Sequence, residues 1–235
     1  MKLMPKQTLT SMNYNIISTG SKGNAVVIGG IILIDCGVPF SALKGVYKDI
    51  KLVLLTHIHS DHFVPSTIRL LHERRPSLRF ACCEWLVNDL IKAGVCKYNI
   101  DVLEIGVMYD YGAFKVSPVR LYHNVPNAGY RLYFGTEKVF YATDTSTLDG
   151  ISAKNYDLYM VEANYDPKRI IEDINEKKIK GEYAYEMNVM KNHLSKPDCD
   201  EFIKNNRGPN SRYVYLHQHK YSEEEQSDDN VRSDN

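Results

Sequence analysis

The sequence predicts an α/β fold in which two mixed β-sheets stack face to face and helices cover their outer sides, an αββα sandwich. Strand-like runs dominate both halves of the 235 residues, for example at 25–28 and 157–162. Helical patterns with a proline near the start are interspersed, as at Pro65 and Pro167. Each sheet must bury its apolar faces, so strands in both halves with helices between them favour this layered arrangement.

The first half of the chain supplies one predicted sheet. Glycines separate its early strands. The run at 51–56 is almost entirely apolar, as expected for a strand covered on both faces. Strands are predicted at 13–18, 25–28, 31–35, 51–56 and 79–82, and helices after Pro39 and over 65–75 and 84–93.

The second half supplies the other sheet. Gly135 lies between two strand-like runs and predicts a hairpin. Strands are predicted within 102–121, with turns at Gly106 and Gly112, and at 129–134, 138–142, 157–162 and 212–216. Helices are predicted at 167–180 and 197–206, each with a proline near its start.

Charge divides the chain into a single predicted domain, residues 1–221, and an acidic tail, residues 222–235. The tail holds six acidic residues and one basic residue, and its low apolar content predicts disorder. Without the tail, 28 basic residues stand against 23 acidic ones, although the whole chain has no net charge. This excess of +5 suits a polyanionic substrate.

Cysteine usage and hydropathy predict a cytoplasmic protein. The five cysteines are odd in number and form no Cys-x-x-Cys pair, as is typical of a reducing compartment. The start of the chain lacks a signal-peptide pattern, and the longest apolar runs are only as long as a strand. We therefore expect no membrane partner. The oligomeric state stays open.

The segment HIHSDH, residues 57–62, predicts a metal site. It places His57, His59, Asp61 and His62 directly after the apolar run at 51–56. His57 and His59 project to the same side of an extended backbone. Imidazole and carboxylate groups are the ligands that zinc and similar divalent ions prefer. Two neighbouring ions could share the cluster, one facing His57 and His59, the other facing Asp61 and His62.

The pattern His-x-His-x-Asp-His after an apolar strand resembles the signature of the metallo-β-lactamase fold. The resemblance implies two divalent ions, zinc or manganese, and three further ligands. His123 matches the next histidine, Asp144 the aspartate that bridges both metals, and His217 the last histidine. His219 competes with His217 for the last position. His217 is favoured because it directly follows the apolar strand.

Three shorter segments resemble the tRNase Z and WalJ/YycJ-type exonuclease branches of that family: STGSKGNAVVIGG near the start, DLYMVEANYD and NHLS. The likeness implies that His193 donates a proton to the leaving oxygen and that Glu162 supports it. Asp61 would also be essential for hydrolysis as a ligand of the second ion. The expected function is a dinuclear phosphodiesterase, a DNA exonuclease-like nuclease, acting on nucleic-acid or nucleotide phosphodiesters through a metal-bridged hydroxide.

Departures from those branches leave other functions open. The WalJ branch often has histidine in place of Tyr165 and asparagine in place of Lys196, and LHQHK lacks its Ser-x-x-Asn pattern. The 48 residues between Asp144 and His193 are too few for the inserted domain of the β-CASP RNases, and no long tRNA-gripping arm is evident. The alternatives are a cyclic-nucleotide phosphodiesterase, a lactonase or thioesterase, and a metal-free binding protein.

Overall fold

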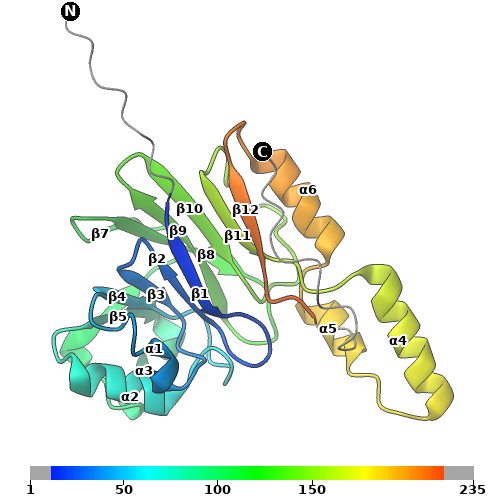
Figure 1. The fold of residues 1–235 in the computed structure, drawn as a ribbon, viewed down its shortest axis with the longest axis horizontal. Helices are drawn as coiled ribbons and strands as arrows, with labels where there is room; N and C mark the ends of the chain where they lie inside the picture. The colour runs from blue at the N-terminus through cyan, green and yellow to red at the C-terminus, as the bar shows by residue number, and fades with distance from the viewer. Residues whose placement is uncertain (1–11, 220–235) are drawn as a thin grey trace, which may run out of the picture.

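The computed structural model describes residues 12–219, and these form the predicted αββα sandwich (Figure 1). Twelve strands in this part of the chain build two six-stranded sheets. Strand order in the first sheet is β1-β2-β3-β4-β5-β6, and in the second it is β12-β11-β10-β9-β8-β7. Each half of the sequence therefore supplies one sheet.

The first sheet is antiparallel at its start and parallel afterwards. The pairs β1–β2 and β2–β3 are antiparallel, whereas β3–β4, β4–β5 and β5–β6 are parallel. The parallel strands therefore end at one common edge. The strands are β1 (Tyr14–Ser18), β2 (Ala25–Ile28), β3 (Ile32–Ile34), β4 (Leu52–Leu54), β5 (Arg79–Cys83) and β6 (Ile100–Leu103).

The second sheet mixes antiparallel and parallel pairs in the same way. From β7 to β10 each neighbouring pair is antiparallel, and β10–β11 and β11–β12 are parallel. The strands are β7 (Tyr109–Asp110), β8 (Lys115–Leu121), β9 (Asn127–Phe134), β10 (Glu137–Ala142), β11 (Leu158–Glu162) and β12 (Arg212–Leu216). The carboxyl ends of β10, β11 and β12 thus lie side by side.

Helices cover the outer sides of the sandwich (Figure 1). Beside the first sheet lie α1 (Phe40–Leu43), α2 (Pro65–Arg74) and α3 (Val87–Lys92), with 3₁₀ turns η1 (Glu84–Leu86) and η2 (Lys97–Asn99). On the opposite side lie α4 (Pro167–Lys180), α5 (Glu186–Asn192) and α6 (Lys196–Asn206). In this view α6 runs along the second sheet, while α4 extends away from the sheets at the lower right.

Apolar side chains fill three layers, as a sandwich with outer helices requires. Leu52 and Leu54 of β4 belong to the layer between the sheets, with Tyr141 of β10. Val53 of the same strand faces the other way and packs in the layer that includes Leu71 of α2. A third layer lies between the second sheet and α6. β4 is therefore buried on both faces, which confirms the prediction made from its continuous apolar run.

Helix α4 has clear capping residues at both ends. The Asp166 side chain caps α4 by accepting hydrogen bonds from the N–H groups of Lys168 and Arg169, at 2.8 and 3.2 Å. Pro167 occupies the first turn, and Gly181 ends the helix with φ of 69°. The proline near the start predicted this helix over 167–180, and these are its observed bounds.

One predicted helix differs in detail from the structure, and one observed helix was not predicted. The helix expected over 84–93 divides into η1 and α3. Helix α5 was not predicted. It has seven residues, its N-cap Tyr185 provides no side-chain hydrogen bond, and Glu186 is its only buried residue. A helix without a cap or a buried apolar stripe leaves no periodic signal in the sequence.

One prediction falls outside the described residues. The acidic tail, residues 222–235, lies beyond residue 219 and stays a prediction. Cys96 is exposed, whereas the other four cysteines are buried, as expected of small apolar residues. Within residues 12–219, no helix combines the length and apolar character needed to cross a bilayer.

Gly37 allows two segments of the first sheet edge to approach closely. A Cβ atom at this position would lie 1.7 Å from the Asp61 carbonyl oxygen and 2.7 Å from the Asn24 nitrogen. Both neighbours are backbone atoms, so they cannot move without displacing the segments that contain Asp61 and Asn24.

We therefore predict that Gly37→Ala lowers the free energy of unfolding by about 3 kcal/mol or more, the upper range for overpacking. Denaturant unfolding measures the change. Gly45→Ala is the matched control, because a Cβ there meets nothing within 4 Å. It should shift stability by no more than about 0.5 kcal/mol. Equal stabilities for the two variants would contradict the close approach.

Candidate metal centre

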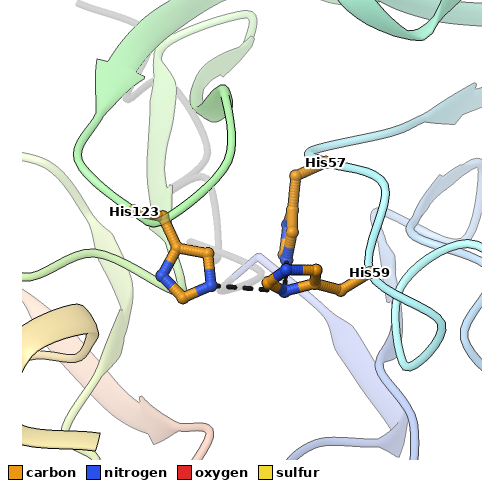
Figure 2. Close-up of side chains that lie close together, drawn as sticks. All are labelled: His57, His59 and His123. Atoms are coloured by element: carbon orange, nitrogen blue, oxygen red, sulfur yellow. Dashed lines mark hydrogen bonds between the residues drawn. The ribbon is translucent and has the colours of Figure 1, made fainter. Parts of the chain in front are cut away.

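Three histidines converge from the ends of β4 and β8 (Figure 2). His57 Nε2 lies 3.2 Å from His59 Nδ1, and His123 Nε2 lies 3.3 Å from the same His59 atom. The other ring nitrogens of His57 and His123 are 2.9 Å from Thr56 Oγ1 and the Asn192 carbonyl oxygen. These outer contacts orient the rings, so that three nitrogens face a common point.

A second group lies beside the first and contains Asp61, His62, Asp144 and His217. His62 Nε2 is 3.0 Å from Asp144 Oδ2, and His217 Nε2 is 3.4 Å from Asp61 Oδ2 and 3.5 Å from Asp144 Oδ1. Asp144 Oδ1 is also 4.0 Å from His123 Nε2. Asp144 therefore lies between the two groups.

The donor set fits divalent metal ions. In each group the ligand atoms lie within 4.8 Å of one another. Burial lowers the pKa of His57 to about 2, which keeps its imidazole neutral, as a ligand must be. Burial also opposes a proton on His62, yet the charges of Asp144 and Asp35 prevail and raise its pKa to about 10. The carboxylates of the second group thus favour a positive charge among them. A donor set of imidazoles and carboxylates suits zinc or manganese.

Asp35 is a residue of the site that the sequence analysis missed. Its Oδ2 lies 2.7 Å from His62 Nδ1, and its Oδ1 accepts a 2.9 Å hydrogen bond from the Thr56 N–H. The Thr56 hydroxyl also donates to both Asp35 oxygens. A carboxylate on Nδ1 fixes the ring so that Nε2 faces the second group. Its only sequence signal was an aspartate ending the apolar run at 31–35.

Two asparagines hold the ligand segments and were also missed. The Asn24 amide donates to the Asp61 carbonyl at 3.2 Å and lies 2.8 Å from His62 Nε2. The Asn164 amide donates to the His217 carbonyl at 2.7 Å and lies 2.9 Å from His217 Nδ1. Both asparagines lie in the segments STGSKGNAVVIGG and DLYMVEANYD, which the sequence analysis singled out without assigning them a role.

Left-handed backbone turns the chain sharply where the ligands leave the sheets. Asp35, Asp144 and His217 have φ of 61°, 57° and 49°, and the remaining non-glycine residue with positive φ in the described chain is Asn155. Residues other than glycine rarely adopt this conformation, and such residues cluster at functional sites. Three of the four here surround the metal centre.

His193 and Glu162 form a close pair beside Asp144. His193 Nδ1 lies 2.6 Å from Glu162 Oε1 and 3.7 Å from Asp144 Oδ1. Glu162 is fully buried at the end of β11, and its Oε2 accepts a hydrogen bond from the Thr145 N–H at 2.9 Å. Burial lowers the pKa of His193, but the hydrogen bond and charge of Glu162 outweigh it and raise that pKa. Glu162 is thus positioned to hold a charged imidazole.

His219 lies apart from the metal centre. Its N–H donates to the Asn164 carbonyl at 2.7 Å, and its side chain joins Asp173 and Glu186. His217, in contrast, lies among the groups around Asp144. The structure therefore brings together all nine residues that the sequence singled out as ligands or catalytic groups: His57, His59, Asp61, His62, His123, Asp144, Glu162, His193 and His217. Their roles stay predictions.

A cavity of about 310 Å³ gives access to the centre. Helix α5 and its N-cap residue Tyr185 form one wall, to which the helix contributes Asn188 and Val189, while the floor includes Asp144 and His193. A second cavity of about 430 Å³ adjoins it and shares His123, Asn124 and Asn192. The wall formed by the helix that was not predicted is therefore part of the site.

A protein-family model described as "Beta-lactamase superfamily domain" matches residues 31–194 of this chain. The chain belongs to the beta-lactamase superfamily. That span includes every proposed ligand except His217, together with His193 and Glu162. The resemblance to metallo-β-lactamase-fold metallohydrolases, predicted from the His-x-His-x-Asp-His segment, is thus confirmed.

Solved structures share this fold at low sequence identity. The metallo-β-lactamase-fold protein YhfI from Bacillus subtilis matches with a TM-score of 0.70 and 17% identity, covering 90% of this chain and 88% of that one. Human tRNase Z, short form, matches at 0.64 and 17%, with 88% and 93% covered. A diphosphatase from the PhnP family matches at 0.62 and 14%, with 88% and 85% covered. A search of curated proteins found no match.

Proposed function

We propose that this protein is a dinuclear metal-dependent phosphodiesterase that acts as a DNA exonuclease-like nuclease. The observation that carries the proposal is the His193–Glu162 pair, joined at 2.6 Å within reach of Asp144. A phosphodiester needs both an activated water and a proton for its alkoxide leaving group. The fold likeness to human tRNase Z and to a PhnP-family diphosphatase is consistent with phosphate chemistry.

Two zinc or manganese ions would divide the ligands. His57, His59 and His123 would hold one ion, and Asp61, His62 and His217 the other, with Asp144 between them. When bound, such ions supply Lewis acidity and an activated water nucleophile. The protein keeps the ligands in place through the bonds that Asp35, Asn24 and Asn164 make.

His193 would protonate the leaving oxygen. Its Nδ1 is occupied by Glu162, so Nε2 would be the atom that carries the proton to substrate. The residue lines the cavity over the metal centre, and its side chain keeps 16% of its exposure, so a substrate can reach it. A thioester releases a thiolate, which leaves without a separate acid, whereas a phosphodiester of a nucleic acid releases an alkoxide. The pair therefore favours phosphodiesters over thioesters.

The second cavity favours a substrate with more than one phosphate. Arg120 and Lys191 line it, and within residues 12–219 neither has an acidic side chain at ion-pair distance. The Arg120 guanidinium instead lies over the Trp85 ring, 5.4 Å from its centre. Two cations without acidic partners beside a cavity attract anions. A nucleic-acid strand could place its scissile phosphate at the metals and its next phosphate here.

A cyclic nucleotide is the second candidate substrate. The cavity over the metals has a volume of about 310 Å³, at the lower end of the range for small-molecule sites. A cyclic mononucleotide would use the metals and His193 but would leave the second cavity empty. Hydrolysis of a nucleic-acid strand should therefore depend on Arg120 and Lys191, whereas hydrolysis of a cyclic nucleotide should not.

Asp61→Ala should lower the metal content by about one ion per chain and abolish phosphodiester hydrolysis. The side chain belongs to the second ligand group, while the backbone carbonyl that bonds Asn24 is kept. Elemental analysis and circular dichroism measure metal content and folding. Asp89→Ala, on α3, is the control and should keep both metal and activity. Full activity in Asp61→Ala would remove this residue from the site.

His193→Ala should slow hydrolysis in proportion to how poor the leaving group is. On DNA, RNA or a cyclic nucleotide the loss should be roughly 10²–10⁴-fold, the usual range for general acid catalysis. On bis-p-nitrophenyl phosphate it should be much smaller, because nitrophenolate leaves without a proton. Glu162→Gln should follow the same pattern more weakly.

The His193→Ala protein should keep its full metal content. Equal losses on both substrates, or loss of an ion, would contradict the proton-donor role and make His193 a ligand instead. Steady-state rates with added Mn²⁺ or Zn²⁺, together with elemental analysis, distinguish these outcomes.

Arg120→Ala and Lys191→Ala should raise KM for an oligonucleotide by roughly tenfold each, since each contact to a phosphate contributes about 1–2 kcal/mol. KM for bis-p-nitrophenyl phosphate should not change, because that substrate has one phosphate. Lys97→Ala on the exposed turn η2 is the matched control for lost charge. An unchanged KM for oligonucleotides would favour the cyclic-nucleotide candidate.

A further inference from the structure

A third cluster of metal-ligating side chains lies outside the catalytic centre. It contains Asp173 of α4, Glu186 at the start of α5 and His219 beyond β12. One ligand atom from each lies within 4.8 Å of the others. The cluster shares no residue with the catalytic groups, and its members come from three separate segments of the chain.

Glu186 has a buried oxygen that lacks a partner. The residue is 1% exposed, although it is the first residue of a surface helix. Its Oε1 forms an ion pair with the Lys177 ammonium, while within the described chain no hydrogen-bond donor reaches Oε2. A buried carboxylate oxygen without a donor has lost its contacts with water and gained none in return, which destabilises the folded state. Such an atom indicates a ligand that completes its surroundings.

We propose that Asp173, Glu186 and His219 form a structural site for a divalent transition-metal ion of the zinc class, here named the α4–α5 cation site. One imidazole nitrogen and two carboxylate oxygens are a donor set that zinc accepts readily. The ion would contact the oxygen of Glu186 that is without a hydrogen-bond donor. It would also offset the negative charges that Asp173 and Glu186 bring together.

The α4–α5 cation site would connect the wall of the active-site cavity to its floor. His219 follows His217 by two residues, and its N–H bonds the carbonyl of Asn164, whose amide holds His217. Helix α5 ends at Asn192, immediately before His193, and lines the cavity. An ion shared by His219 and α5 would therefore fix the helix that precedes His193 relative to the strand that delivers His217.

The competing explanation is that the Lys177–Glu186 ion pair alone holds the cluster. The Lys177 ammonium also lies over the Tyr185 ring, 4.3 Å from its centre. The two explanations differ in the role of Lys177. An ammonium repels a nearby metal ion, so a metal site should survive its removal, while a cluster held by the ion pair should not.

The experiment counts zinc in the full-length protein after saturation with Zn²⁺ and removal of free metal. His219→Ala and Asp173→Asn should each contain one ion fewer than the wild type, and Lys177→Met should contain as many. Glu176→Gln, an exposed acid on the same helix α4, is the matched control and should lose none. The combination of His219→Ala with Asp61→Ala should lose two ions, because the sites are separate.

A thermal-unfolding readout accompanies the count. In the Asp61→Ala background, Zn²⁺ should still raise Tm through the remaining catalytic ion and the α4–α5 cation site. Adding His219→Ala should make that increase smaller, whereas adding Lys177→Met should not. The proposal is overturned if His219→Ala and Asp173→Asn both retain the wild-type zinc content. It is also overturned if Lys177→Met reduces the zinc-dependent increase in Tm as much as His219→Ala does, since the ion pair would then be the stabilising element.

Discussion

Many ionisable groups are buried around one carboxylate, Asp144, and the rest of the fold has to accommodate them. Asp144, 2% exposed, has ring nitrogens of His62, His217, His193 and His123 within 3.0, 3.5, 3.7 and 4.0 Å. Groups of this kind are stable inside a protein only when charges compensate and every polar atom is bonded. The ends of both sheets must therefore meet at one edge, and left-handed turns must redirect the chain there. The sandwich provides that edge because its parallel strands end together.

The ends of the strands and helix α5 contribute to the site in different ways. Strand ends carry the proposed ligands and Glu162, which is fully buried at the end of β11. The wall that faces substrate is helix α5, whose apolar residues Met187 and Met190 are exposed. Little apolar burial holds that helix, so its position depends on polar contacts at its two ends. An ion at the α4–α5 cation site would supply one of these, and the bond from His123 to the Asn192 carbonyl supplies the other.

The sequence predicted the sandwich and the groups that converge in it because their signals are local. An apolar run followed by His-x-His-x-Asp-His specifies both a buried strand and its ligands, and the family order supplied His123, Asp144 and His217. Asp35 and Asn164 were not predicted, because they act through partners 27 and 53 residues away in the chain. Helix α5 was missed for lack of a cap and of an apolar stripe. The chain turns after β12, and this turn places His217, and not His219, in the metal centre.

Anomalous diffraction at the zinc edge, from crystals of the zinc-loaded protein, would locate the ions in the two ligand groups on either side of Asp144. One peak should lie among His57, His59 and His123, and another among Asp61, His62 and His217, with Asp144 contacting both. A single peak at the centre, or none there in an active protein, would rule out a dinuclear site.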